Sequence, residues 1–123
     1  MRVLFFIPTY NDQAGLSELA SSLLRKHPQA SLLVVDDGST PVISLNLKAQ
    51  QETERARLLR LDSNEGLGMA TGIAIDYLLL ENFDCLIRLD ADGQHPESEV
   101  DALKEKISLD FADVVWGERV NQS

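Results

Sequence analysis

The sequence has very few cysteines and no long apolar run. Cys85 is the one cysteine among 123 residues, so neither an internal disulfide nor a metal site made of several thiolates can form. Cys85 stands in an apolar run, where a buried thiol is expected. No apolar stretch reaches the roughly 18 residues that a membrane-spanning helix needs, and the opening MRVLFFIPTYN meets polar residues too early for a signal peptide. These absences predict a cytoplasmic domain without a membrane span in this chain.

Basic residues are scarce as well. The chain has 11 Lys and Arg against 20 Asp and Glu, which gives a net charge of -9 and a sequence pI near 4.5. Nucleic-acid surfaces need clustered Lys and Arg, so a nucleic-acid partner is excluded. An anionic small ligand would need a cation or backbone amides in its site. With 44% hydrophobic residues and no low-complexity tract, the composition is that of one globular domain.

Short apolar runs alternate with amphipathic segments along the chain, which predicts an α/β fold with an open, mainly parallel sheet and helices on both faces. Leu16, Leu19, Ala20, Leu23 and Leu24 recur at helical spacing. Thr40 and Pro41 could supply an N-cap and a first helical residue. The segment 42–57 allows two interpretations, because VISLNL alternates like a strand whereas KAQQETERAR favours helix, and a helix is expected from about residue 45. The expected strands are 3–7, 32–35, 58–61, 84–89 and 114–116, and two further helices are expected at 67–78 and from Pro96.

Four polar signatures come directly after the expected strands. They are PTYN at 8–11, DDGS at 36–39, SNEG at 63–66 and DAD at 90–92. In open α/β sheets the ligand crevice lies outside the carboxyl ends of the strands. The four signatures are therefore expected to meet at one edge of the sheet.

Asp90 and Asp92 are two residues apart, so in an extended chain both carboxylates face the same side. Two neighbouring anions are unfavourable unless a cation lies between them or one is protonated. Mg²⁺ or Mn²⁺ would accept both carboxylates, with Gln94 as a neutral oxygen ligand. Two alternatives remain open: a solvated capping turn, and a phosphohydrolase in which Asp90 is the nucleophile.

Most of the remaining candidate positions allow two interpretations. Asp36 and Asp37 suit a ribose hydroxyl or a base amide, or they cap a turn. Tyr10 could stack on a nucleobase, although a lone aromatic at a strand end is more often a core residue. Gly66 and Gly68 resemble a phosphate loop only loosely, and close packing of a helix on the sheet would explain these glycines as well. His27 is expected on the surface at the end of a helix.

Taken together and in this order, PTYN, VVDDGST, NEGLGMATG and RLDADGQHP resemble glycosyltransferase family 2 over nearly all 123 residues. The wording is most similar to the polyprenyl- or dolichyl-phosphate sugar synthases. The resemblance implies a nucleotide-sugar-binding, Rossmann-like A-type fold. It also implies a substrate-binding set and a metal set. The first is Pro8, Tyr10, Asp36, Asp37, Asn64, Gly68, Asp90 and Arg119; the second is Asp90, Asp92 and Gln94.

The implied activity is metal-dependent, inverting transfer of a sugar from a UDP- or GDP-linked donor to a lipid-linked phosphate or a glycan. Residues 1–123 would form the donor-binding domain, without the acceptor-binding part that follows it in the family, so no catalytic base is assigned. Membrane association would come through that missing part. The chain departs from the family at Asp12, Leu67 and Glu118, where glutamate, a basic residue and serine are usual. A non-catalytic nucleotide-binding module stays open as an alternative.

Overall fold

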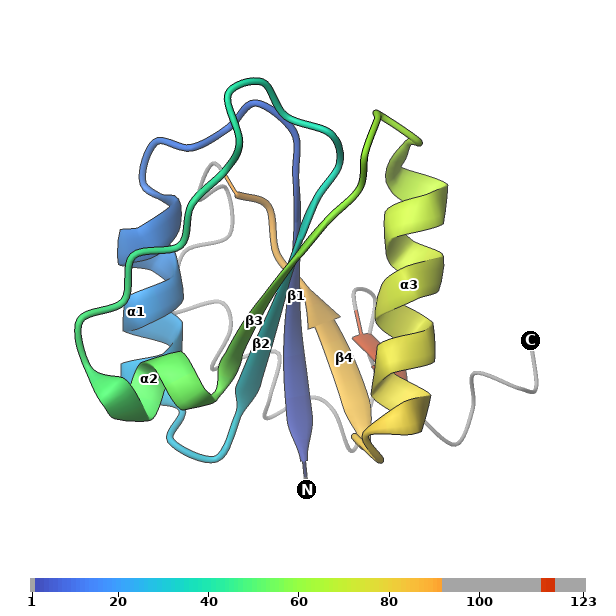
Figure 1. Cartoon of the computed structure of the whole chain (residues 1–123). Helices are drawn as coiled ribbons and strands as arrows, with labels where there is room; N and C mark the ends of the chain where they lie inside the picture. The colour runs from blue at the N-terminus through green and yellow to red at the C-terminus, as the bar shows by residue number, and fades with distance from the viewer. Residues whose placement is uncertain (1, 92–113, 117–123) are drawn as a thin grey trace.

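The computed structural model describes residues 2–91 and the backbone of 114–116. A five-stranded sheet with the order β3-β2-β1-β4-β5 forms its centre (Figure 1). The pairs β1·β2, β2·β3 and β1·β4 are parallel, and β5 runs antiparallel to β4. The predicted open, mainly parallel sheet is confirmed. The strands are β1 Val3–Thr9, β2 Ser31–Asp36, β3 Ala56–Arg60, β4 Cys85–Arg88 and β5 Val114–Trp116.

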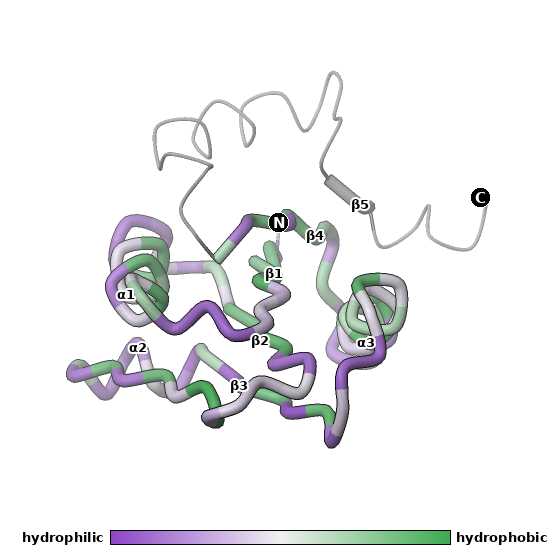
Figure 2. The backbone as a smooth tube through the Cα atoms, turned by 90° about the horizontal axis from the view of Figure 1, so that it is seen from above, coloured by the Kyte–Doolittle hydropathy of each residue, from purple (hydrophilic) through white to green (hydrophobic). Residues whose placement is uncertain are grey.

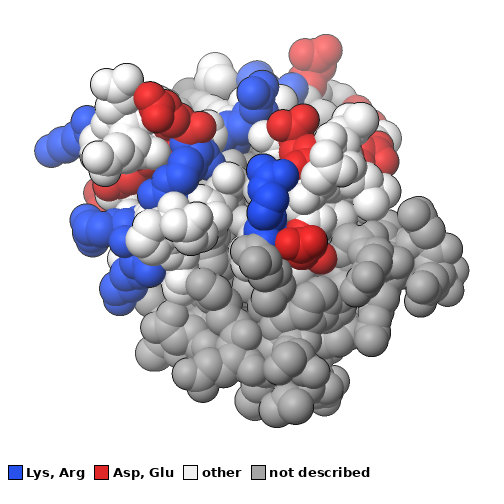
Figure 3. Space-filling model, turned by 90° about the horizontal axis from the view of Figure 1, so that it is seen from below, with Lys and Arg blue, Asp and Glu red and all other residues white. Residues whose placement is uncertain are grey.

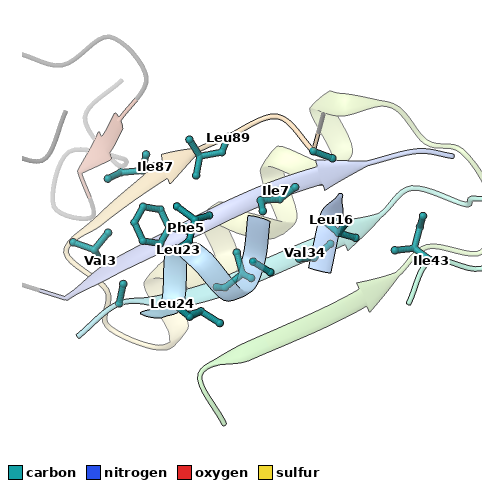
Figure 4. Packing of buried hydrophobic residues seen from close by; sticks show 14 of the residues in the cluster. Val3, Phe5, Ile7, Leu16, Leu23, Leu24, Val34, Ile43, Ile87 and Leu89 are labelled. Carbon is teal, nitrogen blue, oxygen red and sulfur yellow. The ribbon is translucent and has the colours of Figure 1, made fainter. Parts of the chain in front are cut away.

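Two helices cover opposite faces of this sheet, α1 Leu16–Lys26 and α3 Leu67–Leu80 (Figure 2). Leu16, Ala20, Leu23 and Leu24 form the buried face of α1, as the helical spacing predicts. They pack with one side of the strands, including Phe5, Ile7 and Val34 (Figure 4). Because side chains alternate along a strand, Leu4, Phe6 and Leu33 point to the other face, where they pack with Ala70, Ala74 and Leu78 of α3.

The two helices differ on their outer faces. α1 is amphipathic, with Ser17, Glu18 and Arg25 outside its buried stripe. On α3 the exposed positions include Met69, Leu79 and Leu80, and Leu80 has 78% of its surface exposed. The helix α3 is therefore apolar on more than the side that packs on the sheet.

The segment between β2 and β3 forms less helix than expected. Thr40 and Pro41 start no helix, and α2 covers only Gln50–Glu54. Side chains of other segments bind backbone amides of this stretch: the Ile43 amide donates to Asp36 at 3.1 Å and the Ser44 amide donates to Gln13 at 2.8 Å. These tertiary hydrogen bonds hold residues 42–48 in a non-helical conformation, so the helix expected from about residue 45 does not form there. Of KAQQETERAR, at 48–57, only residues 50–54 are helical, because tertiary contacts outweigh local propensity.

His27 lies in the interior, contrary to the expectation of a surface group. It is buried, and its ring centroid lies 5.2 Å from that of Phe5. The polar closure of the α1 terminus comes instead from Arg55, whose guanidinium donates to the carbonyls of Leu24, His27 and Ala30 at 2.6–3.1 Å. The predicted burial of Cys85 is confirmed. No helix among residues 2–91 is long and apolar enough to cross a membrane, and the helix expected from Pro96 lies outside the described residues.

Candidate functional site

A pocket of about 330 Å³ lies where β1, β2 and β4 end and α3 begins. This is the edge at which parallel α/β sheets bind ligands. It brings together five residues predicted from the sequence, from four separate segments. The described residues that line it are Pro8, Thr9, Tyr10, Asp37, Asn64, Gly66, Leu67, Ala70 and Asp90.

Tyr10 forms an aromatic wall of this pocket. Its side chain is 51% exposed, so the core interpretation of this residue is wrong. The backbone on both sides of the ring is tied to the turn after β2. The Asp37 amide donates to the Thr9 carbonyl at 2.9 Å, and the Asn11 amide donates to Ser39 Oγ at 2.7 Å. A ring that is carried by an anchored backbone and remains open to solvent can stack on a flat ligand.

Asp36 is turned away from the pocket and into the protein. It is fully buried, and its carboxylate accepts hydrogen bonds from the amides of Ser39 and Ile43 and from Arg60 Nη1 at 2.8–3.1 Å. Burial alone would raise the pKa of this carboxyl group. The hydrogen bonds from Ser39, Ile43 and Arg60 outweigh burial and hold the pKa below its ordinary value of 3.8. The geometry gives Asp36 the task of fixing the turn, and no described contact supports ligand binding by it.

Asp37 joins the turn after β2 to the start of α3 and also lines the pocket. Its carboxylate accepts from the amides of Glu65 at 2.7 Å and Gly66 at 2.9 Å, which lie directly before the first residue of α3. The Gly66 amide, at the N-cap of α3, belongs to the group that a helix start leaves unpaired, so a carboxylate there is well placed. Asp37 thereby sets the position of the 64–67 wall.

Gly38 allows this close approach of the two loops. Its φ is 79°, and a Cβ atom there would lie 2.5 Å from the carbonyl carbon of Ser63 and 2.6 Å from the nitrogen of Asn64. Gly66 and Gly68 have open space where a Cβ would be, so tight helix packing does not explain them. Gly68 is not among the described residues that line the pocket.

The sequence did not single out Thr9, Gly66, Leu67 and Ala70 as site residues, although they line the pocket. Each stands next to or within a polar signature that the sequence shows, so proximity to PTYN and NEGLG was the available signal. Leu67 is 50% exposed and places an apolar side chain at the pocket.

Of the predicted metal ligands, Asp90 lines the pocket, whereas Asp92 and Gln94 lie outside the described residues, as does Arg119. Carboxylate oxygen is the donor that Mg²⁺ and Mn²⁺ prefer, so Asp90 fits such an ion by its chemistry. Within residues 2–91, no group of three or more His, Cys, Asp or Glu could hold a metal. The ligand set therefore remains a prediction.

A second hollow, of about 430 Å³, lies between α1 and the segment around α2. It is larger than the pocket at the strand ends, but it contains none of the predicted site residues. Glu18, Arg25, Lys48 and Glu52 are among the residues that line it, so it carries charges of both signs. We place the candidate site at the carboxyl edge, where the predicted residues converge.

The fold and the pocket define an α/β domain with a ligand site at the carboxyl edge of its parallel strands. Residues 5–123 match the family model described as glycosyl transferase family 2. The chain belongs to this family.

Curated relatives extend the comparison. The chain is 33% identical to polyprenol monophosphomannose synthase of Mycolicibacterium smegmatis over 121 residues, which cover 96% of this chain and 45% of that protein. It is 32% identical to undecaprenyl-phosphate mannosyltransferase of Micrococcus luteus, with 97% of this chain and 49% of that protein covered. The chain thus spans about half the length of these relatives. The family match favours a transferase over the phosphohydrolase alternative.

Among solved structures, residues 1–349 of TarS from S. aureus match 86% of this chain and 33% of that chain, with a TM-score of 0.57 and 21% identity. The structure of the same protein in complex with UDP matches with a TM-score of 0.57 as well. At this identity the likeness supports the fold.

Proposed function

We propose that this chain is the donor-binding part of an inverting, metal-dependent glycosyltransferase whose donor is a sugar linked to UDP or GDP. One observation carries the proposal: the pocket combines the exposed ring of Tyr10 with the carboxylates of Asp37 and Asp90, and no Lys or Arg is among its described lining residues. A nucleoside presents a flat face for the ring and polar hydrogens for the acceptor oxygens.

The acidic lining is the reason for proposing a metal. A diphosphate beside Asp90 would be repelled unless a positive charge lay between them. Mg²⁺ or Mn²⁺ held by Asp90, Asp92 and Gln94 would supply that charge, and the bound ion would stabilise the nucleoside diphosphate as it departs from the sugar. Asp37 and Asn64 would contact the nucleoside beside Tyr10.

The acceptor is proposed from the relatives. One is named for a polyprenol monophosphate sugar and the other for undecaprenyl phosphate, which supports a lipid-linked phosphate acceptor here, with a glycan as the alternative. A phosphate acceptor is already anionic, so it needs no catalytic base before it attacks the sugar carbon. A single displacement of this kind inverts that carbon. A lipid-linked acceptor would bring the reaction to the surface of a membrane.

Calorimetric titration tests the donor site. Purified chain is titrated with UDP-glucose and GDP-mannose, each with and without Mn²⁺, and the titration is repeated on Asp92→Asn. The matched control is Asp62→Asn, which removes a carboxylate from the same end of the sheet but not from the described pocket lining. We expect metal-dependent binding of one donor, abolished in Asp92→Asn and retained in Asp62→Asn. Metal-independent binding, or no heat from a folded sample, would contradict the proposal.

Transfer itself is tested with undecaprenyl phosphate and the donor that binds. Magnetic resonance of the product reports its anomeric configuration, and we expect the opposite configuration to that of the donor. Retention would reject the inverting mechanism. Release of phosphate from an aryl phosphate, lost in Asp90→Asn, would support the phosphohydrolase instead.

A further inference from the structure

Arg60, the last residue of β3, is connected to the pocket although it is not among the described residues that line it. In the register of the sheet it pairs with Asp36 of β2. Its Nη1 atom donates both to Asp36 Oδ2 at 2.8 Å and to the Ser39 carbonyl at 3.1 Å. One nitrogen thus holds the start and the end of the turn that follows β2.

Hydrogen bonds also connect the turn after β2 to the loop that carries Tyr10. Asp36 accepts the Ser39 amide at 2.9 Å, and Ser39 Oγ accepts the Asn11 amide at 2.7 Å. Asn11 completes the link because its side-chain oxygen accepts the Thr40 amide at 2.9 Å. A continuous chain of hydrogen bonds therefore runs from Arg60 to the residue directly after Tyr10.

The position of the ring depends on this chain, since Tyr10 is 51% exposed and has little packing to fix it. Binding a ligand orders both the side chain that stacks on it and the backbone that carries this side chain, and both cost conformational entropy. A backbone that is already ordered removes the second cost. Asn11 has a φ of 55°, a left-handed conformation that needs such support outside glycine.

We propose that Arg60 is a positioning residue for nucleotide binding, which acts through Asp36, Ser39 and Asn11 on the ring of Tyr10. This inference rests on the proposed function for its ligand, but the placement of the turn can be measured without one. Arg60 is not among the described residues that line the pocket, so in this proposal its effect is transmitted by the turn.

The first measurement is amide hydrogen exchange at Asn11 and Thr40 in Arg60→Met, Arg60→Lys and the control Arg57→Met. Arg57 lies on the same strand, and its guanidinium lies over the ring of Tyr77, 6.0 Å from the ring centroid. We expect exchange at both amides to rise at least about tenfold in Arg60→Met. Exchange in Arg60→Lys should stay near the unmodified rate, because one ammonium nitrogen can make both contacts. Unchanged exchange in a folded Arg60→Met would overturn the proposal.

The second measurement is the affinity for UDP or GDP with Mn²⁺, in the Arg60 variants and in Tyr10→Ala. We expect Arg60→Met to weaken binding about tenfold, or 1.4 kcal/mol, and Arg60→Lys to restore it. In a Tyr10→Ala background the same change should cost little, because the ring that it positions is gone. An equal loss in both backgrounds would overturn the proposed route through Tyr10.

The two measurements separate two kinds of failure. If the unmodified chain binds neither nucleotide, the proposed function fails, and the exchange rates still decide whether Arg60 holds the Tyr10 loop. If the chain binds nucleotide but Arg60→Met behaves like Arg57→Met, the positioning role fails and the proposed function stands. The melting temperature of each variant confirms that it is folded.

Discussion

At the two ends of the sheet, side chains of opposite charge bind the termini of the helices. At the amino end, Arg55 donates to the carbonyls at the terminus of α1, and Arg2 donates to the carbonyls of Glu81 and Asn82 after α3. Figure 3, which looks at this end, shows Lys and Arg beside Asp and Glu among its described side chains. At the carboxyl end, Asp36 and Asp37 accept backbone amides, including those before α3. The arrangement follows helix polarity, since helix ends expose carbonyls and helix starts expose amides.

The difference separates stability from binding. The arginine contacts at the amino end bind carbonyls near the ends of helices. Neither Arg2 nor Arg55 is among the described residues that line the candidate pocket. The aspartate contacts at the carboxyl end join loops that also form the pocket walls, so one side chain such as Asp37 serves both purposes. Variants that remove the arginine contacts at the amino end should therefore change the free energy of unfolding alone. Variants that disturb the joined loops at the carboxyl end should change nucleotide binding as well.

The largest effect is expected for Gly38→Ala at the carboxyl end. The new Cβ would lie 2.5 Å from the backbone of Ser63, and the φ of 79° is unfavourable for alanine. We expect a loss of about 3–4 kcal/mol in unfolding free energy, from strain and overpacking together. Nucleotide affinity should fall too, because the 63–67 loop must move. Urea unfolding and calorimetry measure the two quantities.

Gly15→Ala is the matched control for that variant. Gly15 has a φ of 77°, yet no atom lies within 4 Å of the place of its Cβ. It should therefore show only the conformational cost of about 1–2 kcal/mol. Equal losses in the two variants would mean that the close approach of Gly38 to Ser63 contributes nothing.

The second effect is expected for Arg55→Met at the amino end. The change leaves three carbonyls without their guanidinium partner, which should cost about 2–3 kcal/mol in unfolding free energy. Nucleotide affinity should not change in the folded variant. Arg57→Met, two residues along, lacks these contacts and should stay within about 0.5 kcal/mol of the unmodified chain. A weaker nucleotide affinity in folded Arg55→Met would contradict the claim that contacts at the amino end affect stability alone.

The sequence predicted the fold well because its strongest signals are periodic. The spacing of Leu16, Ala20 and Leu23 defined α1, and the apolar runs located β1, β2 and β4. It failed for residues 42–48, where the hydrogen bonds from Ile43 to Asp36 and from Ser44 to Gln13 join distant parts of the chain. Local propensity contains no information about such partners.

The site was predicted with the same limitation. The motifs predicted that residues after different strands would meet, because parallel strands end at one edge of a sheet. The pocket does contain Pro8, Tyr10, Asp37, Asn64 and Asp90. The motifs put both Asp36 and Asp37 in the substrate-binding set, although successive side chains of an extended chain point to opposite sides. The position of Arg60 beside Asp36 depends on strand order, which the sequence does not show.

The smallest effect is expected for Asp36→Asn, and it is measured as a dependence of the unfolding free energy on pH. Because hydrogen bonds keep the pKa of Asp36 below 3.8 in the folded protein, the unfolded chain takes up a proton first as pH falls. The charged carboxylate therefore stabilises the fold fully at a pH above the pKa of the unfolded chain. This stabilisation is lost as pH falls through the pKa of the folded protein. Asp36→Asn should be less stable by about 1.5 kcal/mol at pH 7, and this gap should narrow below pH about 4. Urea unfolding from pH 7 to pH 3 measures it, with Asp62→Asn as an exposed control. A gap that is constant with pH would mean that the Asp36 charge contributes nothing, and the contrast between the two ends would then rest on geometry alone.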